Sequence, residues 1–164
     1  MKPRLILDTN VLISAIFFEA GNEARILDEV LKGVVTLVSS LDTLQEFRET
    51  LAAPKFKLTP LEILTNFQLI VSVSEIVLAP RSSKVKCRDP DDQMFLDCAE
   101  GGDADFLVTG DGDLLEIKNL GRIKILAAGE MIRLFKRSIF GLAGTSKLSK
   151  REAFKRLDQM REEE

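Results

Sequence analysis

The sequence predicts an α/β fold: a three-layer α/β/α sandwich around a central, mostly parallel sheet of about five strands. Two observations predict it. Short apolar runs alternate along the chain with longer segments of helical spacing, which is the order of strand–helix–strand units. Each run is apolar at nearly every position, as is typical of strands that are buried on both faces of a parallel sheet. The expected strands are 5–7, 34–38, 76–78, 106–108 and 123–126.

Helices are expected between these strands, and most have a recognisable start or stop. Segment 11–18 is dense enough in apolar residues for a buried helix that Asn10 could cap. Gly33 ends the next helix, from about residue 22 to 32. In the helix from about residue 59 to 71, Thr59 and Glu62 have capping-box spacing around Pro60. The remaining helices are expected over 40–51, 89–100 and 128–136, and a basic loop over 80–88.

The chain of 164 residues has the length of one domain with an appendage. We predict this domain over residues 1–140, then a linker and a charged C-terminal helix over 141–164. Ser149 to Glu152 has the spacing of a capping box, and Ala153, Leu157 and Met160 form one apolar stripe. The first residues do not read as a signal peptide, so we expect a cytoplasmic protein without a membrane span.

The composition limits the kinds of catalytic and metal sites that the chain can form. The chain contains no His, Tyr or Trp, and its two cysteines, Cys87 and Cys98, are too far apart for a paired metal motif. These absences exclude His-dependent triads, His-ligated zinc and Tyr acid–base catalysis. A site made of carboxylates and hydroxyls instead favours hard cations such as Mg²⁺ or Mn²⁺.

Carboxylates are concentrated in one window. Residues 89–113 contain nine Asp and Glu and no Lys or Arg. Like charges destabilise one another unless they are solvated or bind a cation. The window therefore either coats a surface or contributes to a metal site.

Four acids are placed to meet at one edge of the predicted sheet. Asp8 follows the first strand, Asp111 follows the fourth, and Asp92 lies in the first turn of the helix before the fourth strand. The carboxyl ends of parallel strands share an edge where ligands bind, and Glu46 reaches it if its helix leans over that edge. Taken singly, each acid also has a structural explanation. Asp8 could cap a helix, and Glu46 could face solvent on its helix. Asp92 could interact with the helix dipole, and Asp111 could be a turn residue.

Four segments resemble the PIN-domain nucleases. They are Leu-Ile-Leu-Asp8-Thr9-Asn10-Val-Leu-Ile-Ser14, Leu44-Gln45-Glu46-Phe47, Arg88-Asp-Pro-Asp-Asp92, and Leu107-Val108-Thr109-Gly110-Asp111-Gly112-Asp113. Their order and spacing resemble in particular the VapC-like branch, the toxin component of a prokaryotic toxin–antitoxin pair. The resemblance runs from about residue 5 to 134 and leaves out the C-terminal tail.

The resemblance implies a PIN-like fold and a ribonuclease that cleaves single-stranded RNA with Mg²⁺ or Mn²⁺. By position, the family's catalytic and metal-binding acids fall on Asp8, Glu46, Asp92 and Asp111. Asn10 and Thr109 match supporting polar positions, and Asp113 is a further possible ligand. The third acid is open among Asp89, Asp91, Asp92 and Asp97, and the distance to the fourth strand favours Asp92. Expected partners are RNA, a cognate antitoxin and a second copy of the chain.

Other readings fit less well. A haloacid-dehalogenase-type phosphatase needs a second Asp where Asn10 stands, and a receiver domain needs an acidic pair where Thr9 follows Asp8. Segment 89–100 has EF-hand length but places Met94 where the loop needs Gly. The alternative from another class is a non-catalytic PIN-like module that binds RNA or protein. Lys84, Lys86 and Arg88 are the basic residues that we expect to attract an RNA backbone.

Overall fold

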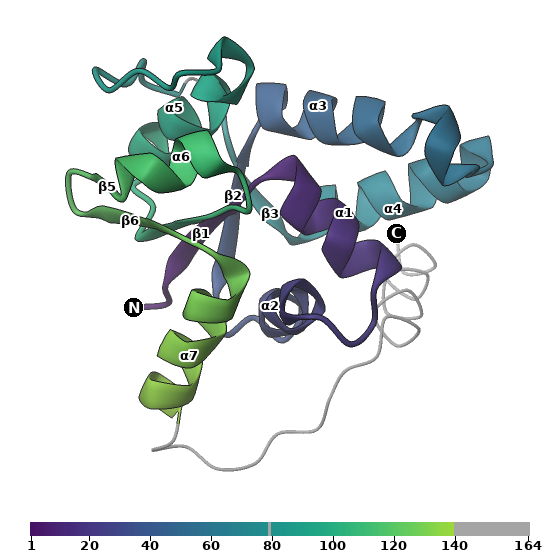
Figure 1. Ribbon diagram of the computed structural model, residues 1–164. Helices are drawn as coiled ribbons and strands as arrows, with labels where there is room; N and C mark the ends of the chain where they lie inside the picture. The colour runs from purple at the N-terminus through teal and green to yellow at the C-terminus, as the bar shows by residue number, and fades with distance from the viewer. Residues whose placement is uncertain (79, 140–164) are drawn as a thin grey trace.

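The protein is built around a six-stranded sheet with the order β3-β2-β1-β4-β6-β5 (Figure 1). The computed structural model describes residues 1–78 and 80–139. Neighbouring strands run parallel except β5, which pairs antiparallel with β6. The strands are β1 (Arg4–Leu7), β2 (Thr36–Ser40), β3 (Ser74–Val77), β4 (Phe106–Val108), β5 (Asn119–Leu120) and β6 (Ile123–Leu126).

Helices cover both faces of this sheet, so the predicted three-layer α/β/α architecture is confirmed (Figure 1). Five helices pack on one face, and α5 and α6 pack on the other. The five are α1 (Thr9–Phe17), α2 (Asn22–Leu31), α3 (Leu41–Leu51), α4 (Pro60–Val73) and α7 (Ala128–Ile139), and the other two are α5 (Gln93–Gly101) and α6 (Gly112–Ile117).

The residues of β1 show how one strand serves both layers. Leu5 and Leu7 belong to the larger core with α1, α2, α3 and α7, whereas Ile6 belongs to the smaller core with α5 and α6. Successive side chains of a strand point to opposite faces, and all three are at most 3% exposed. This double burial explains why Leu5, Ile6 and Leu7 are all apolar.

Several element boundaries differ from those expected. The helix after β1 begins at Thr9 and is capped by Asp8, whose carboxylate accepts the N–H of Val11 at 2.8 Å, so the expectation of an Asn10 cap was wrong. Strand β2 lies two residues later than predicted, and Ser39 and Ser40 pair with β3. The segment 89–100 is divided into a 3-10 turn, η2 (Pro90–Asp92), and helix α5.

Three short elements were not predicted: the two-residue strand β5, the six-residue helix α6 and the 3-10 turn η1 (Pro54–Phe56). The predicted linker and C-terminal helix over 141–164 lie outside the described residues. Across the described ranges, none of the helices has the length and apolar character to cross a membrane.

Candidate functional site

The candidate site lies at the carboxyl end of β1 and β4. These strands are parallel neighbours with Leu7 opposite Val108. The next residues, Asp8 and Thr109, therefore emerge side by side, and the backbone N–H of Asp8 donates to the carbonyl of Val108 at 3.1 Å. The chain passes from β1 to β2 and β3 on one side and later returns to β4 on the other. Such a reversal of strand order is where α/β sheets open a crevice for ligands.

Asp8 is almost completely buried, at 3% exposed, and both of its carboxylate oxygens are hydrogen-bonded. Oδ1 accepts the N–H of Val11, and Oδ2 accepts the hydroxyl of Thr109. Burial raises the pKa of Asp8, and the charge of Asp111 raises it further, while the hydrogen bonds from Thr109, Val11 and Gly110 oppose the rise. The threonine thus holds a buried carboxylate in one orientation.

Glu46 extends from the middle of α3 toward the same edge. Its carboxylate accepts the hydroxyl of Thr9, the first residue of α1. Burial raises the pKa of Glu46, and the charges of Asp8 and Asp91 contribute to the rise, whereas the Thr9 hydrogen bond lowers it. The predicted condition, that this helix leans over the strand edge, is therefore met by a direct contact between α3 and the start of α1.

Asp92 ends η2 and directly precedes α5, and its side chain caps neither element. Burial raises the pKa of Asp92 to about 6, and the charges of Asp111, Asp89, Asp8 and Glu46 add to the rise. All three of the other predicted acids thus act on this one carboxyl. The mutual repulsion of carboxylates across the site is the expected electrostatic property of a pocket that binds a cation.

Asp111 caps α6, and its Oδ1 accepts the N–H groups of Asp113 and Leu114 at 2.8 and 3.1 Å. Its own N–H donates to the hydroxyl of Thr109 at 3.0 Å. Thr109 is fully buried and so connects the start of this helix to Asp8. One threonine therefore fixes two of the predicted acids relative to each other.

The neighbouring acids have other contacts. Asp89 accepts the N–H of Asp91 at 2.9 Å within η2. Asp97 accepts the N–H of Ser83 at 2.7 Å and the side-chain amide of Gln93 at 3.0 Å. Asp89 and Asp97 are thus engaged in local contacts, and Asp91 acts on the pKa of Glu46. Asp92 is the member of this group whose pKa is raised by all three of the other predicted acids.

The three predicted supporting residues differ in their position relative to the site. Thr109 lies within the site, as described above. Asn10 lies exposed in the first turn of α1, next to Asp8 and Thr9 in the chain. Asp113 is drawn into an ion pair with Arg88 at 3.3 Å, and Arg88 also contacts Glu116 at 2.8 Å. Sequence reasoning missed Thr9, although its position directly after the first acid, at the start of a helix, was a usable signal.

The four acids are of the right chemical type to bind a hard cation, but their side chains do not already surround one point. They offer carboxylate oxygens, the ligands that Mg²⁺ and Mn²⁺ prefer. Within residues 1–78 and 80–139, however, no three Asp, Glu or Cys side chains are grouped closely enough to hold one ion. Asp8 and Glu46 are each turned toward a threonine hydroxyl. Binding an ion would therefore exchange these hydrogen bonds for metal contacts.

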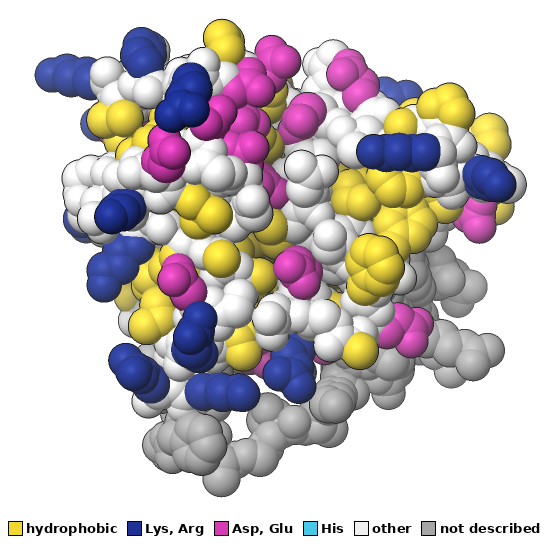
Figure 2. Space-filling model, in the orientation of Figure 1, with side chains coloured by type: hydrophobic (Ala, Val, Ile, Leu, Met, Phe, Trp, Pro, Cys, Tyr) yellow, Lys and Arg dark blue, Asp and Glu magenta, His cyan; other side chains and the backbone are white. Residues whose placement is uncertain are grey.

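A cavity of about 500 Å³ extends the site between α3 and α5. It is lined by Asp42, Gln45, Glu46, Glu49, Asp91 and Met94. The space-filling view shows the resulting concentration of acidic side chains at the top of the molecule (Figure 2). This side of the site therefore repels anions.

Comparison with known proteins identifies the family. The sequence profile of the PIN domain matches residues 4–113, which include all four predicted acids. An uncharacterized protein of Methanocaldococcus jannaschii, MJ1680, is 31% identical over 125 residues, which is 73% of this chain and 77% of that protein. The fold is similar to the crystal structure of VapBC2 from Rickettsia felis bound to a DNA fragment from their promoter, with 17% identity, a TM-score of 0.53, and coverage of 74% of this chain and 96% of that one. The chain belongs to the PIN-domain family.

Proposed function

We propose that this protein is a metal-dependent endoribonuclease that hydrolyses phosphodiester bonds of single-stranded RNA. PIN domains are generally metal-dependent nucleases. RNA as the substrate and Mg²⁺ or Mn²⁺ as the ion are parts of this proposal. One observation carries the proposal: the strand order brings Asp8 and Asp111 to one edge, where Thr109 joins them, and Thr9 holds Glu46 over it. The charges of all three contribute to the raised pKa of Asp92. Raised pKa values of Asp8, Glu46 and Asp92, to which neighbouring carboxylates contribute, support a cation site better than a solvated surface.

In this proposal Asp8, Asp92 and Asp111 hold the principal ion, and Glu46 completes the set or holds a second ion. A bound ion would neutralise charge on the phosphate and favour attack by water. The chain's own residues supply orientation. Thr109 positions Asp8 and the start of α6, and Thr9 positions Glu46. Asn10 and Asp113 are placed around this set, Asp113 in contact with Arg88.

The direct test is cleavage of a labelled single-stranded RNA by purified protein in Mn²⁺. We expect cleavage that EDTA stops and that Asp8→Asn reduces at least 100-fold, because removing one charge-stabilising group of an active site costs about that much. Asp103→Asn is the matched control. It removes the same charge from an 83% exposed side chain just before the amino end of β4, at a positive φ that Asn tolerates. Cleavage that survives in EDTA would overturn the mechanism, and no cleavage at all would favour the non-catalytic binding module.

We further propose that the protein is the toxin of a toxin–antitoxin pair, with a cognate antitoxin as its protein partner. The likeness of fold to the VapBC2 structure supports this assignment. Induced expression should arrest growth, and the Asp8→Asn variant should not. Normal growth with abundant active protein would contradict the toxin role. A homodimer stays a prediction, which light scattering on the purified chain would test.

A further inference from the structure

We propose that residues 80–88, here named the basic loop, bind backbone phosphates of single-stranded RNA through Lys84 and Lys86. The loop contains Arg81, Lys84, Lys86 and Arg88 and no acidic residue. It leads directly into Asp89 and η2, which carries Asp92. The choice of RNA rests on the proposed function, whereas the loop's capacity for phosphate rests on its own structure.

Helix α5 fixes the backbone of the basic loop. The N–H of Ser83 donates to Asp97 at 2.7 Å, and the N–H of Cys87 donates to the side-chain oxygen of Gln93 at 2.9 Å. The amide nitrogen of Gln93 donates to the carbonyl of Val85 at 3.1 Å. Two side chains of one helix thus hold three alternate residues of the loop, so the loop has a defined shape before any ligand binds.

The start of the loop is held by close packing. A Cβ on Gly101, the last residue of α5, would lie 2.7 Å from the Cα of Pro80 and 2.8 Å from the N of Arg81. Only glycine allows the loop backbone to cross the helix at this distance. The loop is therefore attached to α5 near both of its ends.

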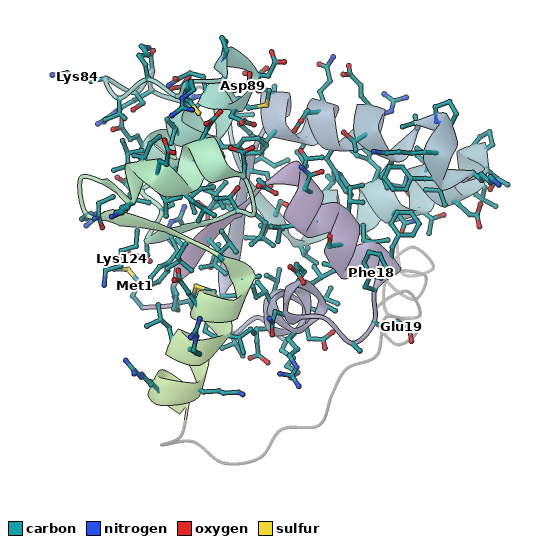
Figure 3. All side chains as sticks on the ribbon, viewed as in Figure 1. Met1, Phe18, Glu19, Lys84, Asp89 and Lys124 are labelled. Atoms are coloured by element: carbon teal, nitrogen blue, oxygen red, sulfur yellow. The ribbon has the colours of Figure 1, made fainter. Side chains whose placement is uncertain are left out.

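The contacts to α5 are made by the loop backbone and leave both lysine side chains exposed. The backbone groups of Ser83, Val85 and Cys87 make the contacts to α5; Ser83 is 1% exposed, whereas Val85 is itself 38% exposed. The alternate residues, Lys84 and Lys86, are exposed, and in the described part of the chain neither has an acidic partner within ion-pair distance. Figure 3 shows Lys84 pointing away from the tip of the loop. Two exposed ammonium groups, two residues apart in the chain, thus extend from a backbone that α5 holds in place.

Arg88 has a different role from the two lysines. Its guanidinium is engaged by Asp113 and Glu116 of α6, which joins the end of the loop to the helix that Asp111 caps. Its charge is therefore already balanced by carboxylates. Arg88 connects the basic loop to the acid site. Lys84 and Lys86, like the exposed Arg81 at the start of the loop, have no acidic partner within ion-pair distance in the described part of the chain.

Charge is distributed unevenly around the site, with acidic residues on one side and basic residues on the other. On the α3–α5 side the cavity lined by Asp42, Glu46, Glu49 and Asp91 repels a polyanion. On the other side the basic loop attracts one. Figure 2 shows dark blue side chains at the upper left beside the acidic cluster, and Figure 3 labels Lys84 and Asp89 in the corresponding places. A strand whose phosphate lies in the acid site therefore runs over the basic loop rather than along the acidic cavity.

The test measures RNA binding without cleavage. The background is the full chain with Asp8→Asn in EDTA, and the probe is a 5′-labelled 12-nucleotide oligouridylate followed by fluorescence anisotropy. Three double variants are made on this background and compared with it. The first carries Lys84→Ala and Lys86→Ala, the second Lys84→Glu and Lys86→Glu, and the third, as the control, Arg25→Ala and Lys136→Ala. Arg25 and Lys136 are exposed residues of α2 and α7, on the part of the molecule away from the basic loop (Figure 1), and they match the change in charge.

Each phosphate contact of a single strand contributes about 0.7 to the slope of log affinity against log salt. Loss of both lysines should therefore reduce the slope by about 1.4 and weaken binding about tenfold or more at roughly 0.1 M salt. The Glu variants should bind still more weakly, and the Arg25/Lys136 control should keep its slope within about 0.3. Equal slopes for the loop and control variants, or no binding by the background protein, would overturn the proposal. Metal-dependent cleavage of RNA by the wild type would stand in either case.

Discussion

At the scale of single residues, Thr109 is the residue on which the geometry of the candidate site depends most. It is fully buried, its hydroxyl donates to Asp8, and the same oxygen accepts the N–H of Asp111 at 3.0 Å. Thr9 makes the corresponding contact to Glu46. Threonine hydroxyls thus orient two of the predicted acids, Asp8 and Glu46.

Replacement of Thr109 tests this role. Thr109→Val keeps the shape but leaves an oxygen of Asp8 and the N–H of Asp111 without a partner, at a cost of about 1–3 kcal/mol in the free energy of unfolding. Thr109→Ser keeps the hydroxyl and should lose about 1 kcal/mol or less, for one buried methyl group. Urea denaturation of both variants measures the difference. Equal stability of the two would show that the hydroxyl does not matter.

The raised pKa of Asp92 predicts how the stability of the metal-free protein changes with pH. Its pKa is about 6 in the folded protein and close to 3.9 in an unfolded chain. Between these values the folded state binds more protons, so stability falls as pH rises through this window. Asp92→Asn removes the ionisation and should raise Tm in EDTA at pH about 7.5 by about 2–4 °C, corresponding to about 1 kcal/mol after solvent screening.

The comparison at about pH 4 serves as the control for this prediction, since Asp92 is then protonated in the folded state and the substitution should change Tm little. Asp91→Asn removes a neighbouring charge from the same turn and should have the smaller effect at the higher pH. A lower Tm for Asp92→Asn at pH about 7.5 would mean that this carboxylate stabilises the metal-free fold.

At the scale of elements, α5 connects the acid site to the basic loop. It begins directly after Asp92, holds the loop through Gln93 and Asp97, and ends at Gly101, where the loop backbone crosses it. The position of Asp92 and the shape of the loop therefore depend on the same helix.

Gly101→Ala tests this arrangement. Alanine is normally favoured over glycine in a helix by about 1 kcal/mol, but here its Cβ would lie 2.7 Å from backbone of the loop. We expect a net loss of about 1–3 kcal/mol in urea denaturation. Gly112→Ala is the control, because α6 begins at this residue and nothing lies within 4 Å of an added Cβ. A Gly101→Ala variant as stable as the wild type would show that the loop moves freely away from α5.

The elements also show what the sequence could predict. Long apolar or capped segments were found: β1, β4, β6 and α4 lie close to their predicted positions because burial and capping dominate there. β2 was placed two residues too early, because polar Ser39 and Ser40 end the apolar run although both are strand residues and Ser40 is also the cap of α3. Strand β5 and helix α6 are too short for any periodicity to predict.

The placement of the site residues was predictable only in part. Strand ends and family-like motifs selected Asp8, Glu46, Asp92 and Asp111, which the structure brings within electrostatic reach of one another. The threonine contacts and the ion pair of Arg88 with Asp113 depend on side-chain orientation. Orientation follows from tertiary packing, which local sequence does not specify. The catalytic roles of these residues stay predictions.

At the scale of the whole molecule, the sheet order places the site. β1 is the central strand from which the chain first moves to β2 and β3 and later to β4 on the opposite side. The crevice at this reversal brings together acids that are far apart in the sequence. Together, we propose, these acids form one cation site.

Binding of Mn²⁺ to the purified full chain tests this claim most directly. At an Mn²⁺ concentration about 100-fold above Kd, the wild type should gain about 2.7 kcal/mol, a rise in Tm of about 5–10 °C. Asp103→Asn should keep this rise, whereas Asp8→Asn and Asp92→Asn should each lose most of it, because each removes a predicted ligand from the same site. Rises equal to that of the wild type in both the Asp8→Asn and Asp92→Asn variants would show that these acids do not form one cation site.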